Sequence, residues 1–243
     1  MKIIEKLAAK QRDVWNAPPV SIAFLGDSVT QGCFEIYQDE NSNIETVFEQ
    51  SAGYPHDVAK ILAFLYPKVP IQIINAGLSG DNAPHALKRL NRDVISHNPD
   101  LVIICFGLND SMVGLDFLPA YETALDQMMS ELITHNIEVI FMTPNMMNTD
   151  ISCRLKQDWI REYAVQTCRV QTEGIMEQFL SAAKHICKKH GIPVCDCYQK
   201  WNTLYQGGVP ITELLANKTN HPARPMHWLF AMSLVETMFG KSN

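Results

Sequence analysis

Four short segments of the chain carry a serine, a histidine, amides and small residues in a pattern that suits nucleophilic catalysis. A serine hydroxyl is a weak nucleophile until a base takes its proton, and its tetrahedral adduct needs hydrogen-bond donors for the oxyanion. Ser28 can attack, and His221 is a neutral base near pH 7. The backbone N–H of Gly80 and the side-chain amide of Asn109 can donate to the oxyanion. The segments are Gly26-Asp27-Ser28-Val29-Thr30-Gln31-Gly32, Ser79-Gly80-Asp81-Asn82, Gly107-Leu108-Asn109-Asp110 and Asn220-His221-Pro222.

Three of these segments directly follow predicted strands, so the fold must bring them together. β-type runs at 20–25, 71–75, 101–106, 138–143 and 192–195 alternate with helical patterns at 54–66, 82–97, 117–135 and 172–190. The runs at 22–25 and 101–106 are apolar at nearly every position, as in strands covered by helices on both faces. The sequence therefore predicts an α/β fold, a three-layer α/β/α sandwich with a central parallel five-stranded sheet. In such sheets ligands bind at the carboxyl ends of the strands.

The chain is expected to form a single domain over residues 1–243, because no linker or internal repeat divides it. Residues 1–17 are predicted as a leading helix that includes Val14 and Trp15 on its apolar face. A last helix should begin at Pro225 and place its apolar residues on one stripe, namely Trp228, Met232, Val235 and Phe239. Residues 144–170 are predicted as an irregular insertion near the active-site edge that offers polar and aromatic groups to a ligand: Asn145, Asn148, Asp150, Arg154, Trp159, Arg161 and Tyr163.

The four segments resemble the sequence blocks of the SGNH, or GDSL-type, hydrolases, in the same order and at similar spacings over residues 20–239. The resemblance implies the flavodoxin-like SGNH hydrolase fold. It implies Ser28 as nucleophile and His221 as general base. It also implies an oxyanion hole formed by the Ser28 and Gly80 backbone N–H groups and the Asn109 side chain. Family members are esterases, lipases and carbohydrate deacetylases that use no metal or organic cofactor, so none is expected here.

One position departs from that pattern. The family usually has an aspartate three residues before the histidine, and this chain has Lys218 there. We expect a Ser-His dyad in which a backbone carbonyl holds Nδ1 of His221. The alternative hypothesis is a catalytically weak or silent relative that binds a glycan or another ligand.

Other polar residues near the four segments are expected to be structural. Asp27 and Asp110 are predicted to accept hydrogen bonds from loop N–H groups rather than to act as acids. His227 is predicted to pack inside the last helix rather than to act as the base.

The composition argues against nucleic acid and membranes as partners and leaves a small-molecule substrate as the expected partner. The net charge is −6, and no basic run exceeds Lys188-Lys189, so neither nucleic acid nor an anionic membrane surface is an expected partner. The longest apolar run, Leu101–Leu108, is far shorter than a membrane span. No phosphate-binding P-loop, dinucleotide fingerprint or G-x-S-x-G elbow occurs.

The cysteine count and the first residues bear on the compartment. Seven cysteines and an N-terminus without an apolar signal core predict a cytoplasmic protein without a disulfide framework. Cys187, Cys195 and Cys197 lack the two paired motifs of a zinc site, so no metal is predicted there. No oligomeric state is predicted.

These observations lead to one expected function. The protein should be a serine esterase that hydrolyses short-chain acyl esters, acetyl above all, of a small polar or carbohydrate alcohol. No apolar groove or lid for a long acyl chain is evident in the sequence.

Overall fold

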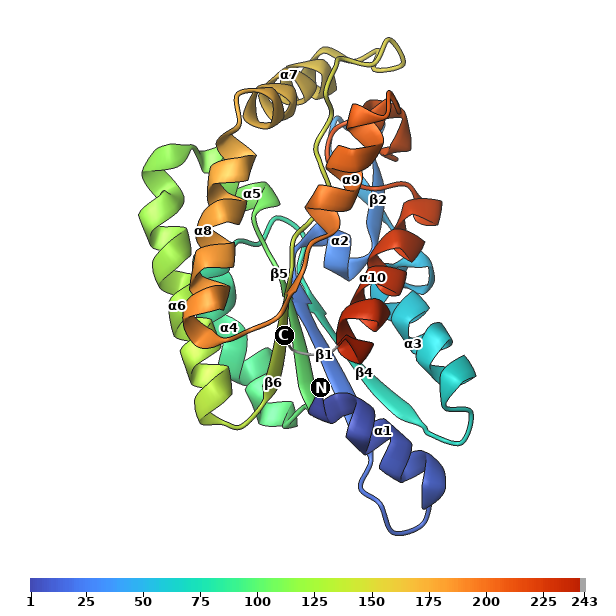
Figure 1. Ribbon diagram of the computed structural model, residues 1–243. Coiled ribbons are helices and arrows are strands. Elements are labelled where there is room, and N and C mark those ends of the chain that lie inside the picture. The colour runs from blue at the N-terminus through green and yellow to red at the C-terminus, as the bar shows by residue number, and fades with distance from the viewer. Residues whose placement is uncertain (241–243) are drawn as a thin grey trace.

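A parallel five-stranded sheet forms the middle layer of the molecule, in the order β4-β1-β5-β6-β7. The computed structural model describes residues 1–240 (Figure 1). All neighbouring strands in this sheet run parallel, which confirms the predicted fold class. The strands are β1 (Val20–Gly26), β4 (Ile71–Gly77), β5 (Leu101–Cys105), β6 (Glu138–Met142) and β7 (Val194–Cys195).

Helices cover both faces of the sheet, and each face has its own apolar cluster. The side chains of β1 and β5 point alternately into the two clusters, so every residue of these strands is buried. One cluster includes α1 (Lys2–Arg12), α3 (Tyr54–Leu65), α9 (Cys197–Gln206) and α10 (His227–Phe239). The opposite cluster includes α4 (Ala83–Asp93), α6 (Leu118–Thr134) and α8 (Ile175–His190), which lie on the other side of the sheet in Figure 1.

The strand order creates an opening at the carboxyl edge. From β1 the chain passes to β4 on one side and then returns to β5 on the other, so the loops after β1 and β5 diverge. This is the flavodoxin-like switch point, where α/β sheets bind ligands. The segments that carry Ser28, Gly80 and Asn109 follow β1, β4 and β5 at this point. The fold thus brings together the segments that the sequence singled out.

Three elements at the carboxyl edge are short or lie outside the layers. They are α2 (Ser28–Gln31), α5 (Leu108–Val113) and α7 (Asp158–Thr172), with α7 at the top of Figure 1. The prediction of an irregular segment over 144–170 was therefore wrong for its second half. Buried Ile160 and Ala164, four residues apart on one face of α7, pack with Leu155 in a small separate cluster. This spacing of apolar residues is typical of a helix, but the many charged residues around it make the spacing hard to recognise in the sequence.

Both terminal helices differ from the prediction. The first helix ends at Arg12, and Val14 and Trp15 are exposed beyond it. The last helix begins at His227, after a 3₁₀ turn at Arg224–Met226. Its predicted apolar stripe is wrong as well, because Trp228, Met232 and Phe239 are about half exposed and only Val235 is buried. The buried face instead carries Phe230, Leu234 and Met238.

A hairpin that the sequence analysis missed leaves the body of the molecule after α2. It consists of β2 (Cys33–Gln38) and β3 (Ile44–Phe48), which pair with each other in a separate antiparallel sheet. Cys33 and Phe34 are buried, whereas no residue of β3 is fully buried. The hairpin is therefore anchored to the body mainly at its first two residues.

No helix within residues 1–240 is long and apolar enough to cross a membrane.

Candidate active site

Ser28 and His221 form a hydrogen-bonded pair at the carboxyl edge of the sheet. Oγ of Ser28 lies 2.9 Å from Nε2 of His221. Ser28 is the first residue of α2 and is only 4% exposed. Asp27 caps α2 by accepting a hydrogen bond from the Val29 N–H. The short helix thereby fixes the direction in which the Ser28 side chain points.

The hydrogen-bond partner of Nδ1 determines which ring nitrogen of His221 carries the proton. Nδ1 lies 3.0 Å from the backbone carbonyl oxygen of Phe34, the second residue of β2. A carbonyl can only accept a hydrogen bond, so Nδ1 carries the proton and Nε2 of the neutral ring accepts from Ser28. Burial lowers the pKa of His221 to about 4, although the hydrogen bond to Phe34 and the charge of Glu35 act in the opposite direction. His221 is therefore neutral at pH 7.

Asn217 organises the loop that presents His221. Its Oδ1 accepts hydrogen bonds from the N–H groups of Thr219, Asn220 and His221. The loop also makes a short bridge between Leu215 and Pro222. Sequence analysis did not select Asn217, although an asparagine followed closely by a turn is a known signal for this kind of side-chain capping.

The candidate oxyanion donors face the same edge. Gly80 has φ +78°, a left-handed conformation that strongly favours glycine, and a Cβ there would meet nothing within 4 Å. The glycine is required by this backbone angle rather than by crowding. Within residues 1–240 the N–H groups of Ser28 and Gly80 have no hydrogen-bond acceptor. Asn109 donates one amide hydrogen to the carbonyl oxygen of Asp81 at 2.8 Å, so its second amide hydrogen remains available.

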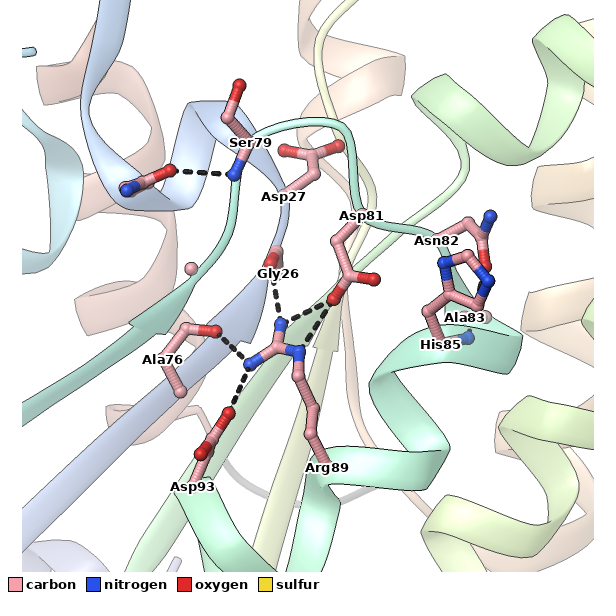
Figure 2. A network of polar contacts seen from close by, with 12 residues as sticks. Gly26, Asp27, Ala76, Ser79, Asp81, Asn82, Ala83, His85, Arg89 and Asp93 are labelled. Atoms are coloured by element: carbon pink, nitrogen blue, oxygen red, sulfur yellow. Dashed lines mark hydrogen bonds and ion pairs between the residues drawn. The ribbon is translucent and has the colours of Figure 1, made fainter.

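A buried arginine joins the segments that carry Ser28 and Gly80 (Figure 2). The Arg89 guanidinium donates to Oδ2 of Asp81 through Nε at 2.8 Å and Nη2 at 2.5 Å. It also donates to the carbonyl oxygens of Gly26 and Ala76, at the ends of β1 and β4, and to Asp93. The side chains of Arg89 and Asp81 are 9% and 1% exposed. The loop that holds Gly80 is thus tied to both strands.

Two further carboxyl groups lie buried beside this network. Asp110 accepts from the N–H groups of Ala83 and Gly107 at 2.9 and 3.0 Å, and Asp27 accepts from Val29. Both carboxyl groups bind backbone N–H groups as predicted, but those of Val29 and Ala83 belong to the first turns of α2 and α4 rather than to loops. Burial raises the pKa of each to about 7, and nearby Asp81 adds to the effect. The second oxygen of Asp27 has no hydrogen-bond partner within residues 1–240.

His227 is placed for packing, as predicted. It is fully buried, stacks on Tyr54 and lies edge-on to Phe230. Its Nδ1 accepts a hydrogen bond from the Tyr54 N–H at 3.0 Å. Within residues 1–240 the Ser28 hydroxyl is hydrogen-bonded to His221 and not to His227.

The sequence profile of the GDSL-like lipase/acylhydrolase family matches residues 24–229, most of the chain and all four segments. The chain belongs to this family.

Two characterised relatives of this GDSL-like chain are similar over part of their length. An acetylxylan esterase of Geobacillus stearothermophilus is 29% identical over 132 residues, which are 51% of this chain and 58% of the relative. An arylesterase of Vibrio mimicus is 33% identical over 99 residues, 38% of this chain and 48% of the relative. The matched region thus spans about half the length of each relative.

Solved structures of GDSL-like proteins share the fold. The structure of an acetylxylan esterase from Geobacillus stearothermophilus superimposes with a TM-score of 0.68 at 21% identity, covering 92% of this chain and 95% of that one. A lipase/acylhydrolase from Enterococcus faecalis gives a TM-score of 0.64 at 24% identity, covering 89% and 94%.

Lys218, where GDSL-like sequences usually have an aspartate, lies in a left-handed conformation with φ +61°. Its ammonium group donates to the backbone carbonyl and the side chain of Glu213. The chain thus has the Phe34 carbonyl, and no carboxylate, at Nδ1 of His221.

The segment before α7 does not offer all its polar groups to a ligand, contrary to expectation. Asn145 and Asn148 are fully buried. Asn145 donates to the carbonyl oxygen of Asn220, and the Asn148 N–H donates to that of Thr219, so both support the loop of His221. Tyr163 of α7 accepts a hydrogen bond from the Asn220 side chain. These buried residues therefore hold the His221 loop in place rather than contact a ligand.

The arrangement contains no cluster for a metal ion within residues 1–240. Cys195 and Cys197 are buried, with their sulfur atoms 3.7 Å apart.

Proposed function

We propose that this protein is a serine esterase that hydrolyses short acyl esters, acetyl above all, of a small polar or carbohydrate alcohol. The observation that carries the proposal is the contact of 2.9 Å between Oγ of Ser28 and the unprotonated Nε2 of His221. Family membership supports ester hydrolysis, and the relative named as an acetylxylan esterase supports the acetyl group. Among the buried groups at this edge within residues 1–240, only this pair joins a nucleophile to a neutral base.

The proposed reaction proceeds in two halves. Oγ of Ser28 attacks the ester carbonyl carbon while its proton passes to Nε2 of His221. The oxyanion accepts hydrogen bonds from the N–H groups of Ser28 and Gly80 and from the free amide hydrogen of Asn109. As the adduct collapses, the imidazolium gives its proton to the departing alcohol oxygen. Water then attacks the acyl-serine with His221 again taking the proton. As this second adduct collapses, the imidazolium returns the proton to Oγ of Ser28 and the carboxylic acid leaves.

A groove beside the His221 loop is the proposed site for the alcohol. It has a volume of about 580 Å³ and lies between β2, residues 154–160 and the turn at Lys218. Its walls carry Tyr37, Arg154 and Gln157, which combine an aromatic ring with hydrogen-bonding groups. Such walls suit a hydroxylated alcohol better than a long acyl chain.

We also propose that the protein acts in the cytoplasm. All seven cysteines are thiols in the structure, the state that a reducing compartment maintains.

Hydrolysis of p-nitrophenyl acetate by the wild type and by Ser28→Ala tests the proposal. The wild type should turn over, and the variant should be folded and inactive. A fluorophosphonate should add its mass to Ser28 only. Equal rates for the two proteins would instead favour the silent, ligand-binding alternative. In a series from acetate to decanoate the rate should fall as the acyl chain lengthens, whereas a maximum at octanoate or longer would point to a lipid substrate.

A further inference from the structure

The carbonyl group that holds His221 belongs to a hairpin with little support of its own. Only the first two residues of β2 are buried, and the hairpin forms no ladder with the central sheet. A hairpin of two strands is marginally stable by itself in water. The Phe34 carbonyl therefore keeps its position through the burial of Cys33 and Phe34 and through the contacts that fasten the rest of the hairpin to the body.

Arg224 makes these contacts from the segment that carries the base. It lies three residues after His221, in the 3₁₀ turn before α10. Nη1 and Nη2 donate to the two carboxylate oxygens of Glu35 in β2 at 2.6 and 3.1 Å. Nε donates to Glu49, just beyond the end of β3, at 2.5 Å. One guanidinium thus binds β2 and the residue that directly follows β3.

The same guanidinium also lies over the residue whose carbonyl contacts His221. Its Cζ is 4.3 Å from the centre of the Phe34 ring, an arrangement in which the cation is attracted to the ring face. His227 contacts the same ring, with a centroid distance of 5.0 Å. Phe34 is therefore held at its ring by Arg224 and His227 and at its carbonyl by His221.

We propose that Arg224, together with Glu35, is a positioning residue that fixes the Phe34 carbonyl against Nδ1 of His221 and so orients the base. The inference rests on the proposed esterase function. A planar guanidinium can grip a carboxylate with two donors and stack on a ring at once, which an ammonium cannot do. Without the Arg224–Glu35 ion pair the hairpin can move and the imidazole of His221 can rotate. Small misplacements of catalytic groups lower rates steeply.

Kinetics of three variants test the inference. Arg224→Gln should lower kcat for p-nitrophenyl acetate by about 10-fold or more, with KM changed by less than about 2-fold. Glu35→Gln should lower kcat in the same way, and Arg224→Lys should lie between the wild type and Arg224→Gln. Arg169→Gln is the control, since Arg169 is an exposed arginine on α7 that pairs with Glu173 and does not line the proposed groove.

Two comparisons separate positioning from a general loss of structure. The double variant Arg224→Gln/Glu35→Gln should be no slower than the slower single variant, because the two residues act through one contact. Effects that multiply would overturn the inference, as would a kcat for Arg224→Gln within about 2-fold of the wild type or a loss confined to KM. Circular dichroism should show the same fold for all variants, as both side chains lie at the surface.

The pH profile and an activity-free measurement complete the test. Glu35 from β2, Arg224 from the His221 segment and His227 from α10 are the charged or titratable groups around His221. Since Glu35 favours the protonated ring, Glu35→Gln should move the acid limb of kcat/KM to lower pH. In proton NMR, the Nδ1–H resonance of His221, assigned by its loss in His221→Gln, should broaden or disappear in Arg224→Gln. An unchanged resonance would contradict the inference even if the wild type proved inactive, so the two proposals can fail separately.

Discussion

Oγ of Ser28 and Nε2 of His221 lie 2.9 Å apart although 193 positions separate the two residues in the chain. The pair is also almost completely removed from water, with each residue 4% exposed. Burial and the carbonyl contact at Nδ1 make His221 a neutral acceptor over most of the pH range.

The acid limb of the activity profile should lie unusually low. Protonation of His221 abolishes its ability to take the Ser28 proton, and burial lowers its pKa to about 4 from the ordinary 6.5. We expect kcat/KM to stay constant as the pH falls to about 5 and to decline around pH 4. Initial rates with p-nitrophenyl acetate, with circular dichroism at each pH, measure this. A limb near pH 6.5 would show that the free enzyme's base is solvated.

Asn109→Ala should lower kcat by ~10²-fold or more while KM changes little, because an oxyanion donor acts mainly in the transition state. The substitution also removes the hydrogen bond to the Asp81 carbonyl. Asn82→Ala provides a control amide in the neighbouring loop, where Asn82 caps α4. Steady-state kinetics distinguish the roles, since an effect on KM alone would make Asn109 a binding residue.

Lys218→Asp should bring no gain in kcat. The Phe34 carbonyl already occupies Nδ1 of His221, and the side chain of residue 218 is directed to Glu213. We expect kcat within about 3-fold of the wild type. A rise of tenfold or more would mean that a carboxylate can displace the carbonyl and complete a triad.

Arg89→Met should destabilise the fold by about 3–5 kcal/mol, because it leaves the buried carboxylate of Asp81 without its partner. Urea unfolding followed by circular dichroism measures the free energy. Arg92→Met is the matched control: its side chain is 76% exposed and pairs with Asp93, so the cost should be about 1 kcal/mol or less. Similar costs for both variants would show that the network in Figure 2 adds little stability.

Asp27→Asn should change how stability depends on pH. A raised pKa in the folded state means that Asp27 stabilises the fold below pH 3.8 and that this contribution is lost as the pH rises towards 7. His221 and His227, whose pKa values fall on folding, have the opposite sign and add stability as the pH rises to 6.5. Asp27 therefore offsets part of the histidine effect in the wild type.

In Asp27→Asn the free energy of unfolding should rise more steeply between about pH 4 and 6.5, by at most ~1.4 kcal/mol per pH unit. The asparagine can still cap α2. Urea titrations at several pH values measure the slope, with exposed Asp116→Asn as control. A slope identical to that of the wild type would mean that Asp27 is ionised in the fold throughout this range.

The parts of the fold that could be predicted are those in which the order of apolar and polar residues indicates burial. The apolar runs of β1 and β5 indicated a sheet covered on both faces, and the segments after the strands then had to meet. The hairpin β2–β3 was not predicted because its mixed polar and apolar sequence shows neither the pattern of a buried strand nor that of a helix. Asn145 and Asn148 were misplaced for a related reason, since a buried amide with internal partners looks like a surface amide in sequence.

The carbonyl of Phe34 also bears on how such a site is recognised and altered. Every residue has a carbonyl oxygen, so no change of codon at position 34 can delete this hydrogen-bond acceptor from His221. Alanine scanning would detect Ser28, His221 and Asn109 but not this acceptor, and a search by residue identity would find no third member of a triad. Replacing the amide that contains the Phe34 carbonyl by an ester through chemical synthesis weakens the acceptor directly. The group that contacts Nδ1 of His221 is thus determined by the path of the backbone and not by the type of residue at position 34.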